Sequence, residues 1–266
     1  MSLAGSSVIV SGAASGIGRA TAERFLELGT RVGAIDRTEP AGPPGALSLV
    51  ADVRDQQAVA EAVNRAADAH GGIDVVVCSA GIDHIGAIDE TGMDVWQRLY
   101  DVNVIGMARV LSAAVPHLRR SERASVVLVA SAVASVGLRN RAAYTATKGA
   151  VVAMTRSLAA EFAPYGIRVV SVSPGTIATP LLQVVNQNRY GDEAPDLDTF
   201  FAEAAERQPL GKIGTPEEVA RTISFMADHE SGLLTGANLL IDGGMTGIYP
   251  TATPAAAPRS EAAPAR

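Results

Sequence analysis

Short runs of β-branched and aliphatic residues alternate along the chain with longer stretches whose apolar residues recur every three to four positions. The short runs predict strands at residues 7–10, 31–36, 47–50, 73–77, 125–130, 167–173 and 238–241. The amphipathic stretches predict helices at residues 17–28, 56–69, 93–118 and 143–163, and a further helix begins at Thr215. Strands that are apolar throughout are buried on both faces, which is typical of a parallel sheet covered by helices on both sides.

The strict alternation of strand and helix predicts a single doubly wound α/β domain. We expect a Rossmann-type, seven-stranded, mostly parallel sheet with helices on both faces, spanning residues 1–248. Residues 183–197 are polar, and we interpret them as a loop within a lid at residues 181–210. The Ala- and Pro-rich residues 249–266 are typical of a disordered tail.

Composition excludes several classes of function. Because 22 basic and 28 acidic side chains give a net charge of −6, we expect no nucleic-acid partner. No apolar run reaches the roughly 18 residues of a membrane span. The single cysteine, Cys78, forms no intramolecular disulfide, which is compatible with the cytoplasm. The four histidines lack metal-ligand spacing, so we expect no metal site.

A glycine-rich turn follows the first strand and opens the first helix. Glycines let the backbone approach an anion closely, and the amides of a helix N-terminus can face a pyrophosphate. This context favours a dinucleotide over an ordinary strand-ending turn. The residues expected to contact the cofactor here are Gly12, Ser15, Gly16, Ile17 and Gly18.

Asp36 ends the second strand, where a carboxylate can accept hydrogen bonds from a ribose diol. The same carboxylate repels a 2′-phosphate, so Asp36 favours NAD over NADP. Arg37, the next residue, favours NADP instead, because a guanidinium can pair with that phosphate. We therefore predict NAD as the cofactor and keep NADPH as the alternative.

Tyr144 and Lys148 are four residues apart at the start of a predicted helix, so their side chains share one face. A phenol is a feeble base at neutral pH, and a nearby ammonium lowers its pKa. Such a pair can take a proton from an alcohol or give one to a carbonyl. Ser131, at the end of the fifth strand, can hydrogen-bond the same substrate oxygen.

Taken in order, these residues resemble the motifs of the short-chain dehydrogenase/reductase family, over roughly residues 3–247. Besides the glycine turn and Ser131, Tyr144 and Lys148, the matching motifs are Asn103 in Asp-Val-Asn-Val, Pro174-Gly175, and Asp-Gly-Gly at 242–244.

The resemblance implies a catalytic set of Asn103, Ser131, Tyr144 and Lys148. Tyr144 would be the general acid/base, Ser131 would polarise the substrate oxygen, and Lys148 would bind the nicotinamide ribose and depress the pKa of Tyr144. Asn103 would hold a helical kink and a water in the proton relay. The resemblance further implies cofactor contacts from Asp52, Val53, Ser79, Ala80, Gly81, Pro174, Gly175, Ile177 and Thr179.

The sequence departs from the family pattern before Ala80-Gly81, where Cys78-Ser79 replaces two asparagines. We therefore do not expect asparagine amides to support this turn, although backbone contact with the adenosine ribose needs no particular side chain. His84 is a candidate for the pocket wall. The role of Arg139, Arg141 and Arg189 stays open between binding an anionic substrate and a solvated or interface position.

The leading hypothesis is an NAD(H)-dependent enzyme that transfers hydride between nicotinamide and a secondary alcohol or ketone. The alternatives are an NADPH-dependent carbonyl or 3-oxoacyl reductase, and a non-catalytic dinucleotide-sensing protein. The resemblance also implies a homotetramer that pairs the long helices at 101–119 and 143–163.

Overall fold

The computed structural model describes residues 3–206 and 208–248, so the tail expected at 249–266 lies outside the described residues. Within these ranges the strands are β1 (Ser7–Ser11), β2 (Arg31–Asp36), β3 (Leu47–Val50), β4 (Val75–Cys78), β5 (Ser125–Val129), β6 (Arg168–Pro174) and β7 (Asn238–Ile241). The α-helices are α1 (Gly16–Glu27), α2 (Gln56–His70), α3 (Met93–Tyr100), α4 (Gly106–Leu118), α5 (Ala142–Phe162), α6 (Pro180–Tyr190), α7 (Leu197–Glu206) and α8 (Pro216–Ala227).

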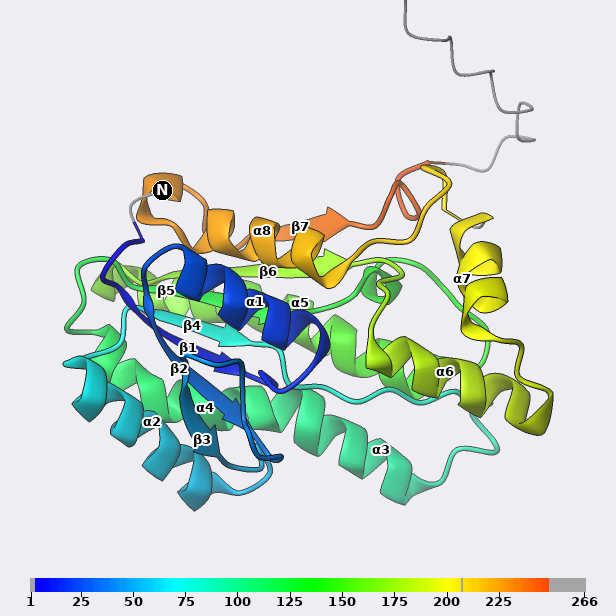
Figure 1. The fold of residues 1–266 in the computed structure, drawn as a ribbon, viewed down its shortest axis with the longest axis horizontal. Helices are drawn as coiled ribbons and strands as arrows, with labels where there is room; N and C mark the ends of the chain where they lie inside the picture. Colours follow the sequence, from blue (N-terminus) through cyan, green and yellow to red (C-terminus); the bar gives the residue numbers. More distant parts are fainter. Residues whose placement is uncertain (1–2, 207, 249–266) are drawn as a thin grey trace, which may run out of the picture.

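The strands form one parallel sheet in the order β3-β2-β1-β4-β5-β6-β7. Helices α1 and α8 pack together on one face, and α2, α4 and α5 cover the other (Figure 1). Every residue of β1, β4, β5 and β6 is buried, whereas the edge strands β3 and β7 are partly exposed. The predicted Rossmann-type fold is therefore confirmed.

The helical stretch predicted at 93–118 is continuous but not uniform. A π-helical segment, Asp101–Ile105, joins α3 to α4, so the chain carries an extra residue in the turn that holds Asn103. The hydrophobic period does not reveal this segment, because the helix continues on both sides of it. No helix in the described part of the chain combines the length and apolar character needed to cross a bilayer.

The loop predicted at 183–197 is wrong for most of its length. Helix α6 begins with Pro180 at its first position and continues to Tyr190, and α7 begins at Leu197. The polar composition misled the prediction because most of α6 faces outward, with only Val185 and Asn186 buried. The described residues of this segment therefore include two helices, α6 and α7, which lie beyond β6 (Figure 1).

The topology fixes where a ligand can bind. From β1 the chain moves through β2 and β3 to one edge, and from β4 it moves the other way to β7. Open sheets of this kind bind ligands beyond the carboxyl ends of the strands, at the point where the order reverses. Here that point lies between β1 and β4, whose last residues, Ser11 and Cys78, are register partners.

Candidate active site

The glycine turn lies at this switch point and leaves no space for side chains. Gly12 has a φ of 71°, and a Cβ there would lie 2.7 Å from the backbone of Ala80. A Cβ on Gly18 would lie 2.1 Å from the Gly12 carbonyl oxygen. Ser15 precedes α1 without capping it through its side chain, so the first amides of α1 remain available. This donor set fits the pyrophosphate of a dinucleotide.

The turn after β4 is supported in a way that the sequence interpretation missed. The Ser11 hydroxyl accepts hydrogen bonds from the backbone N–H groups of Ser79 and Ala80, at 3.3 and 3.4 Å. Cys78, fully buried below this turn, has its thiol pKa raised to about 12 by burial. Cys78 is therefore a small core residue and not a nucleophile.

Asp36 ends β2, as predicted, and its carboxylate contacts the glycine turn. One carboxylate oxygen accepts from Ala14 N–H at 3.1 Å, and the other accepts from the backbone and hydroxyl of Thr38. Arg37 is exposed, and its charge helps to lower the pKa of Asp52. The main cause of that lowered pKa is Arg54, whose guanidinium binds both oxygens of the Asp52 carboxylate.

Tyr144, Lys148 and Ser131 come together at the carboxyl edge, from the first turns of α5 and from the end of β5. The Lys148 ammonium is 5.8 Å from the centroid of the Tyr144 ring and donates to the Val129 carbonyl at 2.9 Å. The Ser131 side chain lies near enough to the Tyr144 phenol to help lower its pKa. Tyr144 is 8% exposed and Lys148 5%, so water has little access to the pair.

The electrostatic environment of Tyr144 and Lys148 differs from the one expected from the two residues alone. Burial is the largest influence on Tyr144 and raises the pKa of its phenol well above the ordinary value, the reverse of the direction expected from Lys148 alone. Burial also lowers the pKa of Lys148 to about 8, against the opposing pull of the Asp83 carboxylate. In the protein alone, the buried surroundings therefore oppose the charged form of both groups.

Asn103 occupies the π-helical segment and is fully buried. Its Oδ1 accepts from Ile82 N–H at 2.8 Å, and its Nδ2 donates to the Ile82 carbonyl at 2.9 Å and to the Thr147 hydroxyl at 3.1 Å. Asn103 thus fastens the segment after β4 to α5. Its expected role in a water relay stays a prediction.

Among the other predicted cofactor contacts, Gly175 lies against Asp242, where a Cβ would meet the Asp242 backbone at 2.8 Å. Ile177 is buried and bridges to Gly214, and Thr179 precedes α6. These residues lie after β6, at the same sheet edge as the tyrosine.

Sequence reasoning missed one charged group in the site. The Asp83 carboxylate forms an ion pair of 2.9 Å with Arg141, and their side chains are only 7% and 11% exposed. The Arg141 guanidinium lies 5.1 Å from the centroid of the Tyr144 ring. The only sequence signal was that Asp83 closely follows a strand end. Arg139 and Arg189 are exposed, and His84 hydrogen-bonds Thr91.

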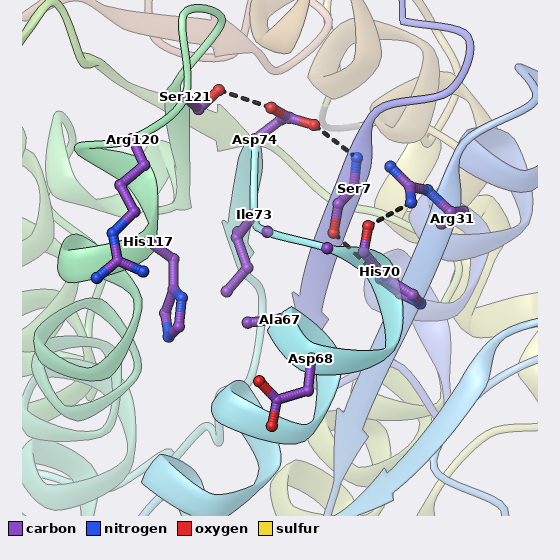
Figure 2. Close-up of a pocket in the computed structure, with 12 residues that line it drawn as sticks. Ser7, Arg31, Ala67, Asp68, His70, Ile73, Asp74, His117, Arg120 and Ser121 are labelled. Carbon is purple, nitrogen blue, oxygen red and sulfur yellow. Dashed lines mark hydrogen bonds between the residues drawn. The ribbon is translucent and has the colours of Figure 1, made fainter.

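A hollow of about 390 Å³ lies at the opposite edge of the sheet (Figure 2). Its polar groups are largely occupied by one another. Asp74 accepts from Ser7 N–H and the Ser121 hydroxyl, and Arg31 donates to the His70 carbonyl. Because it lies at the amino ends of β1 and β4, this hollow takes no part in the site described above. No three potential metal-ligating side chains gather anywhere among the described residues.

The fold and this geometry define a Rossmann-type domain with a tyrosine–lysine site at its ligand edge. The family profile described as enoyl-(acyl carrier protein) reductase matches residues 12–246. The short-chain reductase protein NovJ of Streptomyces niveus is 38% identical, covering 89% of this chain and 92% of its own length. The cis-4-hydroxycyclohexanecarboxylate dehydrogenase of Sinomonas cyclohexanicum is 36% identical, covering 90% of this chain and 96% of its own.

Among solved structures, the ligand-free aldohexose dehydrogenase of Thermoplasma acidophilum superposes with a TM-score of 0.89. It is 33% identical, and the match covers 95% of this chain and 98% of that one. The chain belongs to the short-chain dehydrogenase/reductase family, whose members are oxidoreductases that use a nicotinamide dinucleotide.

Proposed function

We propose that the protein is an NAD(H)-dependent oxidoreductase that interconverts a secondary alcohol and the corresponding ketone, with Tyr144 as general acid/base. The observation that carries this proposal is that Ser131, Tyr144 and Lys148 lie together, shielded from water, at the same edge of the sheet as the glycine turn. A dinucleotide-sensing protein has no need of that set.

A bound nicotinamide ring supplies the hydride chemistry, and the chain supplies geometry and proton transfer. In the oxidative direction, Tyr144 takes the proton of the substrate hydroxyl, and Ser131 orients the same oxygen by a hydrogen bond. The Lys148 ammonium stabilises the tyrosinate and holds the nicotinamide ribose. Asn103 keeps the segment after β4 in register with α5, so that the three groups stay aligned.

The preference for NAD rests on Asp36. Asp36 lies at the end of β2, and its carboxylate accepts a hydrogen bond from Ala14 N–H. A 2′-phosphate bound at this place would be repelled by the negative charge of Asp36. We propose Asp52, Val53, Ser79, Ala80 and Gly81 as the walls of the adenosine site. Separate fluorescence titrations with NADH and NADPH test the preference: we expect NADH to bind at least about tenfold more tightly, a difference of about 1.4 kcal/mol. Tighter binding of NADPH than of NADH would contradict the proposed NAD preference and favour the NADPH-dependent carbonyl reductase.

The activity is tested with a panel of secondary alcohols that includes cyclic hydroxy acids and aldohexoses, the compounds in the names of two relatives. Reduced nicotinamide is followed by its absorbance. We expect Tyr144→Phe to lose at least about a thousandfold in turnover while binding NADH as the unmodified protein does. Wild-type-like turnover in this variant would reject Tyr144 as the base. NADH binding without turnover on any alcohol or ketone would favour the sensor.

Three further features belong to the proposal. Residues 181–210, with α6 and α7, act as a lid over the substrate. A homotetramer is supported by apolar side chains on two surfaces, Ile105 near the start of α4 and Phe225, Leu239 and Leu240 along α8 and β7, which are 39–55% exposed. Sedimentation analysis tests the tetramer, and a monomer would refute it. We place the protein in the cytoplasm, which cell fractionation tests.

A further inference from the structure

The surroundings of Tyr144 contain a charge pair to which the family resemblance assigns no role. Asp83 lies in the segment after β4, and Arg141 immediately precedes α5. The Asp83 carboxylate accepts from Arg141 at 2.9 Å and from His84 N–H at 2.6 Å. Both side chains are almost completely shielded from solvent.

The Arg141 guanidinium has an unusual environment. One of its nitrogens binds Asp83, but Nε and Nη1 are buried without a hydrogen-bond partner. The guanidinium carbon lies 5.1 Å from the centroid of the Tyr144 ring, within the range of a cation–π contact. Arg141 therefore places a buried cation against the Tyr144 ring.

We propose that the Asp83–Arg141 pair tunes the proton affinity of the buried Tyr144 phenol, with Arg141 opposing the effect of a carboxylate that adds to the cost of ionising it. Both are positioning residues. The inference rests on the proposed function of Tyr144 as acid/base, but it concerns how readily that phenol ionises.

The physical reason is proximity at low water content. A carboxylate close to a phenol disfavours tyrosinate, and a guanidinium favours it. Burial is the main reason why the pKa of Tyr144 is raised; next to it, Asp83 raises the pKa further and Arg141 lowers it. The other groups facing the phenol are Ser131 from the end of β5 and Lys148 from α5, while α3 contributes apolar Val95, Trp96 and Leu99.

The test follows the pH midpoint of Tyr144 in variants of the pair. Asp83→Asn retains the shape of the side chain and removes the negative charge, so we expect the midpoint to fall by about one pH unit. Arg141→Met leaves the carboxylate uncompensated, so the midpoint rises by a similar amount. Arg141→Lys retains a cation, so the midpoint rises less than in Arg141→Met. The double variant, without either charge, returns toward the wild-type midpoint.

Two readouts are measured. The first is the pH profile of turnover for alcohol oxidation. The second is the ultraviolet absorbance of tyrosinate with saturating NAD, from which the signal of Tyr144→Phe in the same background is subtracted. Asp89→Asn and Arg123→Met each remove one exposed charge, negative and positive respectively, and should leave both midpoints in place.

A merely structural role would lower turnover equally at every pH and leave the midpoints unmoved, which would overturn the proposal. An acid shift in Arg141→Met would overturn it as well. If Arg141→Met fails to fold, Asp83→Asn decides the matter alone. If no alcohol is oxidised, the proposed function fails, and the absorbance midpoint still decides whether the pair controls Tyr144.

Discussion

Replacing Asn103 by alanine tests how far the site depends on one buried amide. Asn103 is fully buried and makes three hydrogen bonds, two of them to the backbone N–H and carbonyl of Ile82. In Asn103→Ala these two backbone groups lose their partners, and the removed amide leaves a cavity beside the π-helical segment.

The magnitude follows from those contacts. A buried polar group left without its partner costs about 1–3 kcal/mol, so the two groups of Ile82 together cost about 2–6 kcal/mol. Because the cavity is polar, a water that enters it would recover part of this cost. We therefore expect the free energy of unfolding to fall by about 3 kcal/mol, with a larger proportional loss of turnover than of NADH affinity.

Urea unfolding at a fixed protein concentration measures the first effect, and the dependence on denaturant should keep its slope. Asn188→Ala, which removes an exposed amide on α6, serves as the control and should stay within about 0.5 kcal/mol of the wild type. A loss below about 1 kcal/mol in Asn103→Ala would refute the reasoning, because it would mean that the Ile82 groups find equal partners elsewhere.

Three further outcomes are expected. Gly18→Ala should abolish NADH binding in a fluorescence titration, because its Cβ would clash with the Gly12 carbonyl, whereas a Cβ at Gly137 meets no other atom and Gly137→Ala should bind NADH normally. Equal NADH binding by both variants would contradict the assignment of the glycine turn to the cofactor. Arg168→Met should lower the free energy of unfolding by about 3–5 kcal/mol, because the buried guanidinium donates to four backbone carbonyls, two in the last turn of α8 and two beyond it. Urea unfolding measures this change, and a loss under about 1 kcal/mol would contradict the prediction. Burial lowers the pKa of His70 below its ordinary value of 6.5, so the unfolded chain binds more protons than the folded one, and stability should fall as the pH drops through and below 6.5. Thermal unfolding of His70→Gln should show a weaker fall of stability with pH, and the same pH dependence as the wild type would contradict this.

Much of the fold was predictable because strand and helix patterns are local. Continuous apolar runs such as that of β5 revealed buried parallel strands, and the glycine turn marked the reversal point of the sheet. Ser131, Tyr144 and Lys148 were also predictable, since strand-end position and helical spacing place them on one edge.

The charge balance of the site was not predictable. The Asp83–Arg141 pair joins two distant segments, and its importance depends on burial, which neither residue signals by its type. The support that Ser11 gives to the turn after β4 is likewise a contact between segments. The two helices within 181–210 were missed for a different reason, because an exposed helix with few buried residues has a composition close to that of a loop.

These residues are connected by one physical requirement. Excluding water around Tyr144 is a consequence of packing its ring with Leu99, Val133 and Ala143, and this packing raises the pKa of the phenol. A base in such a place needs positive charge from the protein. Tyr144 lies in the first turn of α5, at the positive end of the helix dipole, and Arg141 and Lys148 flank it. One helix start therefore carries the phenol and the two cations, so a displacement of α5 relative to β5 would change the alignment of the base and its basicity together.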